Sequence, residues 1–321
     1  MQSSATRLRV VKRAEPDADS RLELPAVLGS IGNTPLIQLR RIGADLSPGV
    51  RLLAKAEHLN PGGSVKDRPA LRMVLDGRAS GALSNNRILI DATSGNTGIA
   101  YAMIAAAMNF RVMLALPENA SAERKDLLRS YGAELVLTDP LEGTDGAQQI
   151  VREIVQRQPD QFFYPDQYNN VSNWLAHFDG TGQEIIDQTA GNVTHFVAAL
   201  GTTGTFTGVT RRLKHENPKI RCIAVQPDSP LHAMEGVKHL ESSNKPGIYD
   251  ESLPDEILEI GSDEAVRMAR RLALEEGLLI GVSAGANVLA ALRVAQNLES
   301  GIVVTVLCDT GTRYLSDSLA C

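Results

Sequence analysis

Long apolar runs, paired cysteines and an excess of basic residues are all missing from this sequence of 321 residues. No stretch reaches the roughly 18 consecutive apolar residues of a membrane-spanning helix. The three cysteines are far apart and form no zinc-binding pattern, so we expect no metal site and a reducing, cytoplasmic setting. The net charge of −6 gives no electrostatic reason to bind nucleic acid or an anionic membrane. A small metabolite is the expected partner.

The first twenty residues (1–20) combine mixed charges with no apolar stretch, and we interpret them as a mobile tail rather than a targeting segment. From about residue 50 onward, short apolar runs alternate with stretches of helical length. The runs expected as strands are 50–57, 87–92, 111–116, 134–138, 161–164, 194–200, 220–225, 278–282 and 302–308. Because these runs are apolar throughout, they are typical of parallel sheets covered by helices on both faces. Cys222 and Cys308 lie in two of them, which indicates buried thiols.

The segment 226–259 interrupts this alternation with prolines and many charges. Compact domains seldom keep so long an irregular connection without a functional reason, so we expect a functional loop. Its basic candidates for contact with a ligand are Lys238, His239 and Lys245, and a solvated loop face is the alternative for the first two.

Four clusters of glycine and hydroxyl residues follow expected strands: "NPGGSVKDR" (60–68), "TSGNTG" (93–98), "GTTGTFTG" (201–208) and "GVSAGA" (281–286). Open α/β sheets bind ligands beyond the carboxyl ends of their strands. One such cluster is an ordinary turn, whereas four of them at strand ends predict a ligand site.

Lys66 follows the first strand and begins a helix, where the helix dipole opposes a cation. That placement is unfavourable for a purely structural lysine. From the residues alone, Lys66 is a phosphate clamp, a covalent catalyst or a solvated surface lysine.

Two other clusters can bind anions. In "GTTGT" the small residues let backbone N–H groups approach a phosphate, and Thr202, Thr203 and Thr205 add hydroxyl donors. The pattern fits neither a P-loop nor a dinucleotide fingerprint, and a glycine turn that caps a helix is the alternative. "TSGNTG" can direct donors at a carboxylate or simply cap its helix.

Seven motifs in this order carry a family resemblance: "GNTPLIQL", "NPGGSVKDR", "TSGNTGIA", "MLALPENASAERKDLLRSYGAELV", "DQYNN", "GTTGTFTG" and "GVSAGA". Together they resemble the fold type II (β-family) pyridoxal phosphate enzymes, in particular the cysteine synthase and cystathionine β-synthase group, with B-type cysteine synthases the most similar. The resemblance spans about 22–316. It implies two three-layer α/β/α domains with mostly parallel sheets, as in the tryptophan synthase β-like fold.

The resemblance also implies a domain division and a homodimer. The smaller N-terminal α/β domain would span 50–165, be mobile so that it closes over the substrate, and carry the substrate-binding loop. The larger domain, 21–49 plus 166–321, would bind the phosphate of pyridoxal 5′-phosphate.

The resemblance assigns roles to individual residues. Lys66 would hold pyridoxal phosphate as a Schiff base and move the proton at Cα. Asn96 would bind the phenolic oxygen of the cofactor and Ser283 would face its pyridine nitrogen. The phosphate would bind to Gly201, Thr202, Thr203, Gly204 and Thr205, and the substrate carboxylate to Thr93, Ser94, Thr97 and Gln167.

The implied reaction is a β-replacement. A cysteine synthase would make L-cysteine from O-acetylserine, or another O-activated serine, and sulfide through an aminoacrylate. The alternative is a cystathionine β-synthase that joins serine and homocysteine, or a cysteine or serine β-lyase that releases hydrogen sulfide. A non-catalytic binding protein is a third reading, which the complete cofactor motifs disfavour. The motifs fix neither the leaving group nor the sulfur donor.

Overall fold

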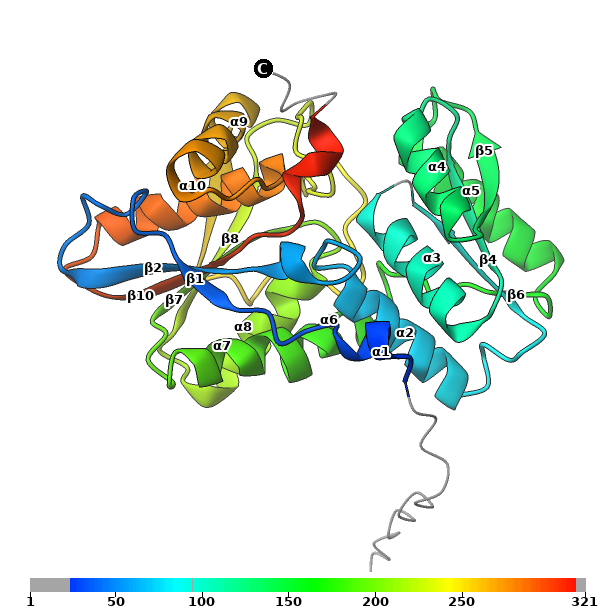
Figure 1. The fold of residues 1–321 in the computed structure, drawn as a ribbon, viewed down its shortest axis with the longest axis horizontal. Helices are drawn as coiled ribbons and strands as arrows, with labels where there is room; N and C mark the ends of the chain where they lie inside the picture. Colours follow the sequence, from blue (N-terminus) through cyan, green and yellow to red (C-terminus); the bar gives the residue numbers. More distant parts are fainter. Residues whose placement is uncertain (1–23, 94, 316–321) are drawn as a thin grey trace, which may run out of the picture.

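The computed structural model describes residues 24–93 and 95–315, so the expected tail 1–20, Ser94 and Cys321 lie outside the described residues. Figure 1 shows two α/β bodies side by side. In chain order the elements are α1 (Ala26–Gly29), β1 (Leu36–Gln38), β2 (Gly49–Lys55), η1 (Glu57–Leu59), α2 (Asp67–Ala79), β3 (Ile88–Ala92), α3 (Asn96–Met108), β4 (Val112–Pro117), α4 (Ala122–Ser130), β5 (Glu134–Thr138), α5 (Gly143–Arg157), β6 (Phe162–Phe163), α6 (Val171–Ala176), η2 (His177–Gly182), α7 (Gln183–Gln188), β7 (His195–Ala199), α8 (Gly204–Glu216), β8 (Arg221–Pro227), β9 (Glu256–Ile260), α9 (Ser262–Arg271), η3 (Leu272–Glu276), α10 (Val282–Gln296), β10 (Ser300–Val306) and η4 (Gly311–Tyr314).

The larger sheet has six strands in the order β1-β2-β10-β7-β8-β9. Only the β1–β2 pair is antiparallel. Neighbouring residues on a strand point to opposite faces, and each face has its own core. Leu52 and Val303 pack with α9 and α10, whereas Leu53 and Val304 pack with α7 and α8. The sheet is therefore buried between two helical layers, above and below it in Figure 1.

The smaller sheet has four parallel strands in the order β5-β4-β3-β6. Every residue of β3 is buried. Leu89 packs on the side of α2, α3 and α4, and Ile90 packs on the side of α5. Helix α3 is apolar all round, and its residues 99–105 are all buried, as expected for a helix inside a layer.

This architecture confirms the predicted α/β class with mostly parallel sheets. One predicted strand is wrong: in 278–282 only Ile280 forms a β-bridge, to Thr310, and Val282 already begins α10. The small residues that follow Gly281 favour a helix. Two short strands, β1 and β9, were not predicted, and β9 forms the end of the expected loop 226–259.

The predicted domain boundary at residue 50 is wrong for one strand. It assigns β2 to the smaller domain, but β2 pairs with β10 in the larger sheet. The reason is that β2 has buried residues on both faces and fits between β1 and β10, inside the six-stranded sheet. The remaining division into two domains stays a prediction. Within residues 24–93 and 95–315, no helix is long and apolar enough to cross a membrane.

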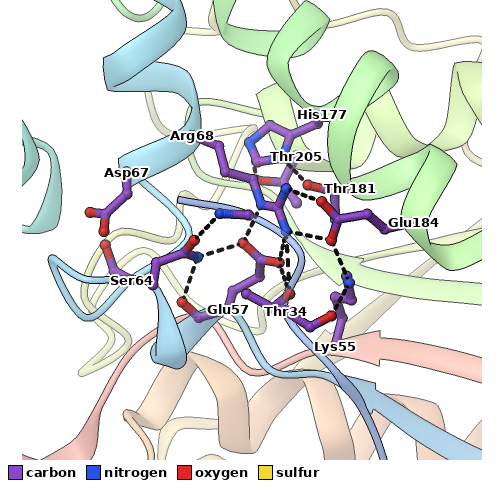
Figure 2. Close-up of polar contacts among 12 residues, drawn as sticks. Thr34, Lys55, Glu57, Ser64, Asp67, Arg68, His177, Thr181, Glu184 and Thr205 are labelled. Atoms are coloured by element: carbon purple, nitrogen blue, oxygen red, sulfur yellow. Dashed lines mark hydrogen bonds and ion pairs between the residues drawn. The ribbon is translucent and has the colours of Figure 1, made fainter. Parts of the chain in front are cut away.

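A cluster of four charges, three of them buried and Glu184 partly buried, joins β2, η1, α2 and α7 (Figure 2). Lys55 Nζ lies 2.6 Å from Glu184 Oε2, and Arg68 Nε lies 2.7 Å from Glu57 Oε2. Arg68 also reaches Glu184, with Nη1 2.6 Å from Oε1. Thr34 Oγ1 donates to Glu57 Oε1 at 2.7 Å and adds the N-terminal segment to the cluster. We call Lys55, Glu57, Arg68 and Glu184 the four-charge cluster.

The cluster keeps its carboxylates ionised. Burial by itself would raise the pKa of Glu184, but the hydrogen bonds and charges of Arg68 and Lys55 outweigh it and lower this pKa to about 2. Burial would also raise the pKa of Glu57, but the charge and hydrogen bonds of Arg68 lower it below its ordinary value. The two carboxylates balance the two cations, so the interior carries no net charge there.

We predict that Arg68→Met lowers the free energy of unfolding by about 3–5 kcal/mol, because it leaves Glu57 buried without a compensating charge. Urea unfolding at pH 7 measures the change. Arg72→Met, one helical turn further along α2, removes half-exposed ion pairs to Asp76 and Asp179 and should change stability by less than about 1 kcal/mol. Equal losses in the two variants would contradict a special role of the cluster.

Candidate active site

Most of the predicted site residues line one cavity between the two sheets, and this cavity has two lobes. Its larger lobe has a volume of about 230 Å³ and its smaller lobe one of about 50 Å³. Lys66, Asn96, Gly201 and Thr202 line both lobes. The larger lobe also has Thr93, Thr97 and Gln167 in its wall, and the smaller lobe has Thr203, Thr205 and Ser283. Gly204 begins α8 beside the smaller lobe, and Ser94 lies outside the described residues.

Lys66 reaches the cavity from a tightly held turn. Gly63 has a φ of +79°, which glycine adopts without strain. Asp67 Oδ2 accepts from the N–H of Gly62 at 2.5 Å, and the N–H of Val65 donates to the carbonyl of Cys308 at 2.8 Å. Burial raises the pKa of Asp67 to about 7. The turn therefore places Lys66 at the N-cap of α2, as predicted, with its side chain in the wall of both lobes.

The loop after β7 forms a cup at the N-terminus of α8. A Cβ on Gly201 would collide with the carbonyl oxygen of Gly236, so only glycine lets the two chains approach. Thr203 has a φ of +69°, a strained conformation for a threonine. Its hydroxyl is buried and has no hydrogen-bond partner among the described residues. A strained, orphaned donor at a helix N-terminus fits a phosphate group well.

Thr205 is held by a histidine that the sequence did not reveal. His177 Nε2 lies 3.2 Å from Thr205 Oγ1, and its Nδ1 lies 2.9 Å from Thr181 Oγ1 (Figure 2). Burial lowers the pKa of His177 to about 3, so the ring is neutral at physiological pH. The signal was weak because a single histidine in "NWLAHFDG" resembles any buried histidine.

The N-terminus of α3 faces the larger lobe. Thr97 Oγ1 donates to Gln167 Oε1 at 2.9 Å, and the N–H of Gly95 donates to Thr93 Oγ1 at 3.3 Å. The side-chain oxygen of Gln167 accepts from Thr97, and its amide N–H groups have no acceptor among the described residues, so they are left for a ligand. The arrangement fits an α-carboxylate, and the helix dipole favours the same charge.

Ser283 lies in the first turn of α10. One turn further along, Asn287 ties the helix to strands β7 and β10. Asn287 Oδ1 accepts from the N–H of Ala199 at 2.8 Å, and its Nδ2 donates to the carbonyl of Val306 at 2.9 Å. The sequence indicated a buried Cys308 within a strand; the strand was wrong, and Cys308 is half-buried. Cys308 follows β10 and lines the smaller lobe, because the strand ends at Val306.

The loop 226–259 supplies cavity residues that the sequence did not single out. These are Glu235, Gly236 and Val237, which line both lobes; Lys238, which the sequence did name as a candidate ligand contact, lines the larger lobe. Arg124 of α4 donates to both carboxylate oxygens of Glu235, with Nη1 2.7 Å from Oε1. The loop thus closes over the cavity and is tied to the opposite body.

Comparison with known proteins agrees with this geometry. Residues 27–309 match the family described as "Pyridoxal-phosphate dependent enzyme". The chain is 49% identical over 310 residues to a cysteine synthase of Aquifex aeolicus, with 95% of each chain covered. It is 44% identical over 287 residues to cysteine synthase B of Salmonella typhimurium, with 89% of this chain and 93% of the relative covered.

Solved structures give the same result. The cysteine synthase (OASS) of Entamoeba histolytica superposes with a TM-score of 0.88 at 33% identity, covering 100% of this chain and 94% of that one. An O-acetylserine dependent cystathionine β-synthase from Helicobacter pylori superposes with a TM-score of 0.86 at 34% identity, covering 92% and 98%.

We predict that Gly201→Ala weakens the binding of pyridoxal phosphate by the apoprotein at least about tenfold, because the added methyl group displaces the cup. Absorbance titration measures the dissociation constant. Gly29→Ala is the control, since a Cβ there has no neighbour within 4 Å. Pyridoxal without its phosphate should bind wild type and Gly201→Ala equally, and an equal loss for both ligands would contradict a phosphate cup.

Proposed function

Because this chain belongs to the pyridoxal-phosphate dependent enzyme family, we propose that it is a cysteine synthase that makes L-cysteine from O-acetylserine, or another O-activated serine, and sulfide. The observation that carries the proposal is the meeting of three devices in one cavity. They are the amine of Lys66, the phosphate cup at α8 and the carboxylate-binding N-terminus of α3. The reaction is a β-replacement on an amino acid.

Pyridoxal phosphate, when bound, withdraws electrons from Cα of an amino acid, which acidifies the Cα proton and lets the β-substituent leave. Lys66 would hold the cofactor and carry the proton from and to Cα. The cup 201–205 would hold the phosphate, and Asn96 would bind the phenolic oxygen. The buried hydroxyl of Thr203, without a partner in the described structure, supports this assignment.

Ser283 would meet the pyridine nitrogen. A hydroxyl does not force a proton onto this nitrogen, as a carboxylate would, so the ring remains a moderate electron acceptor. Under that condition the loss of a β-substituent is favoured over transamination. Ser283 therefore biases the site toward β-elimination followed by addition.

Thr93, Thr97 and Gln167 would bind the substrate α-carboxylate, with Ser94 as a fourth expected partner. The hydrogen bond between Thr97 of α3 and Gln167 of the loop before α6 supports one carboxylate site built from both segments. This carboxylate contact would orient Cα toward Lys66. We also propose, from the family resemblance, a cytoplasmic homodimer whose smaller domain closes over the substrate.

We predict that the wild-type protein forms cysteine from sulfide and at least one of O-acetylserine and O-phosphoserine, measured colorimetrically. Lys66→Ala should lower kcat at least about a hundredfold, because the Cα proton loses its carrier. Lys125→Ala, an exposed lysine on α4 that contacts the carbonyl of Glu118, is the control and should match wild type. Wild-type turnover in Lys66→Ala would contradict the mechanism, and a lack of cysteine from every donor would contradict the function.

A second candidate function is favoured by an outer cavity of about 490 Å³ that adjoins the larger lobe. The two share Thr144, Asp145, Val237 and Lys238. Sulfide is too small to need this space. The outer cavity therefore suits a larger thiol, as in a cystathionine β-synthase that joins homocysteine to an activated serine.

The walls of the outer cavity carry opposite charges. The carboxylates of Glu142 and Asp145 lie at the start of α5, and the cation of Lys238 lies on the loop 226–259, with His232 and His239 in the same wall. Lys238 Nζ lies 5.1 Å from the centroid of the Tyr168 ring. Neither Asp145 nor Lys238 forms an ion pair within the described ranges, and both line the cavity, so both charges remain for a ligand. A zwitterionic amino acid matches such walls.

We predict that homocysteine exceeds 2-mercaptoethanol, cysteamine and 3-mercaptopropionate in kcat/KM by at least about tenfold, because only homocysteine satisfies both walls. Lys238→Met should raise KM for homocysteine and 3-mercaptopropionate. Asp145→Asn should raise KM for homocysteine and cysteamine. The rate with sulfide is the internal control. Equal kcat/KM for all four thiols would leave cysteine synthesis as the function and contradict this second one.

A further inference from the structure

The C-terminal turn η4 contacts Asn96 of the cavity wall through the guanidinium of Arg313. Arg313 Nη1 donates to Asn96 Oδ1, and Arg313 Nη2 donates to the carbonyl oxygen of Gly62. A guanidinium has donors only, so the side chain oxygen of Asn96 must face it. The same guanidinium therefore touches the start of α3 and the turn that carries Lys66.

The other side of the Asn96 amide is fixed by a buried carboxylate. Asp309 is 1% exposed, and its Oδ2 accepts from Asn96 Nδ2 at 2.7 Å. The same Oδ2 accepts from the hydroxyl of Tyr314 at 2.5 Å. Burial and the charge of Asp309 raise the pKa of Tyr314 far above its ordinary value, so this hydroxyl keeps its proton and donates. The nitrogen of the Asn96 amide must then face Asp309.

The two contacts determine what Asn96 offers to the cavity. One N–H of the amide is used by Asp309, and its second N–H has no acceptor among the described residues. Turning the amide over would set its oxygen against Asp309 and its nitrogen against Arg313, which are two repulsive contacts. Asn96 lines both lobes, so the cavity meets a donor at this point and never a carbonyl oxygen.

We propose that Arg313 is a positioning residue that, with Asp309 opposite, locks the Asn96 amide so that its free N–H binds the phenolic oxygen of the cofactor. The proposal rests on the proposed function. The phenolic oxygen is an acceptor, so an amide turned the other way would repel it. The contact of Arg313 with Gly62 keeps the turn of Lys66 in register with the same amide.

The second contact explains the glycine at position 63 of that turn. A Cβ on Gly63 would lie 2.8 Å from Arg313 Nη2, and Thr310 N–H donates to the carbonyl of Gly63 at 3.2 Å. Glycine at this position lets the guanidinium reach past the turn to Asn96. The C-terminal turn and the lysine turn are thus fitted to each other.

The test compares pyridoxal phosphate with an analogue that lacks the phenolic oxygen, each titrated into apoprotein. Arg313→Met should weaken binding of pyridoxal phosphate about tenfold or more, the effect of losing a well-placed donor to an anionic oxygen, and should shift the absorbance maximum of the bound cofactor. The analogue should bind wild type and Arg313→Met within about twofold, since no phenolic contact exists to lose.

Two further variants separate positioning from folding. Arg313→Lys keeps one donor and should bind pyridoxal phosphate between wild type and Arg313→Met, and Asp309→Asn should reproduce the spectral shift. Thr312→Val alters the same turn, where Thr312 contacts only Thr310 in the described structure, and should behave as wild type.

Equal weakening for both cofactors would assign Arg313 a general structural role and overturn the inference. So would unchanged binding and spectrum in Arg313→Met while wild type binds and turns over. A wild-type protein that does not bind pyridoxal phosphate would overturn the proposed function as well, and this separates the two failures.

Discussion

The position of Lys66 depends on the four-charge cluster, because Arg68 of that cluster is only two residues further along the chain. Arg68 is bound on one side by Glu57 and on the other by Glu184, and Lys55 binds the far side of Glu184. Taking four charges out of water is expensive, and their mutual attraction mainly offsets that loss. What the cluster supplies is geometry: β2, η1, α2 and α7 can meet in one arrangement only. The turn 60–66 lies inside this frame and has little freedom left.

Around the frame, helix N-termini converge on one cavity. Four helices, α2, α3, α8 and α10, begin at the cavity. Their first residues are Asp67, Asn96, Gly204 and Val282, and each either lines the cavity or is next in sequence to a residue that does. Each N-terminus carries a partial positive charge and free N–H groups. The proposed ligands carry a phosphate and a carboxylate. The helix N-termini at the cavity between the two sheets would therefore stabilise both anions.

Most of this could be predicted from local sequence. The strands are continuous apolar runs, and the glycine and hydroxyl clusters mark strand ends, so Lys66, Thr93, Asn96 and the cup 201–205 were found without a structure. The strand predicted at 278–282 failed because an apolar run of five residues looks the same at the start of a buried helix. His177, Asp309 and Arg313 act through partners more than 25 residues away, and no spacing in the sequence reveals such pairs.

The loop 226–259 shows why the specificity of the site is harder to read than its cofactor. Gly236 packs against Gly201 of the phosphate cup, Glu235 is bound by Arg124 across the cavity, and Lys238 faces the outer cavity. One segment therefore touches the cofactor cup, the opposite body and the expected path of the second substrate. A change in the loop that admits a larger nucleophile would also move Gly236, which packs against Gly201. Cofactor binding and nucleophile choice are physically coupled in this chain, because three consecutive residues, Glu235 to Val237, serve both lobes.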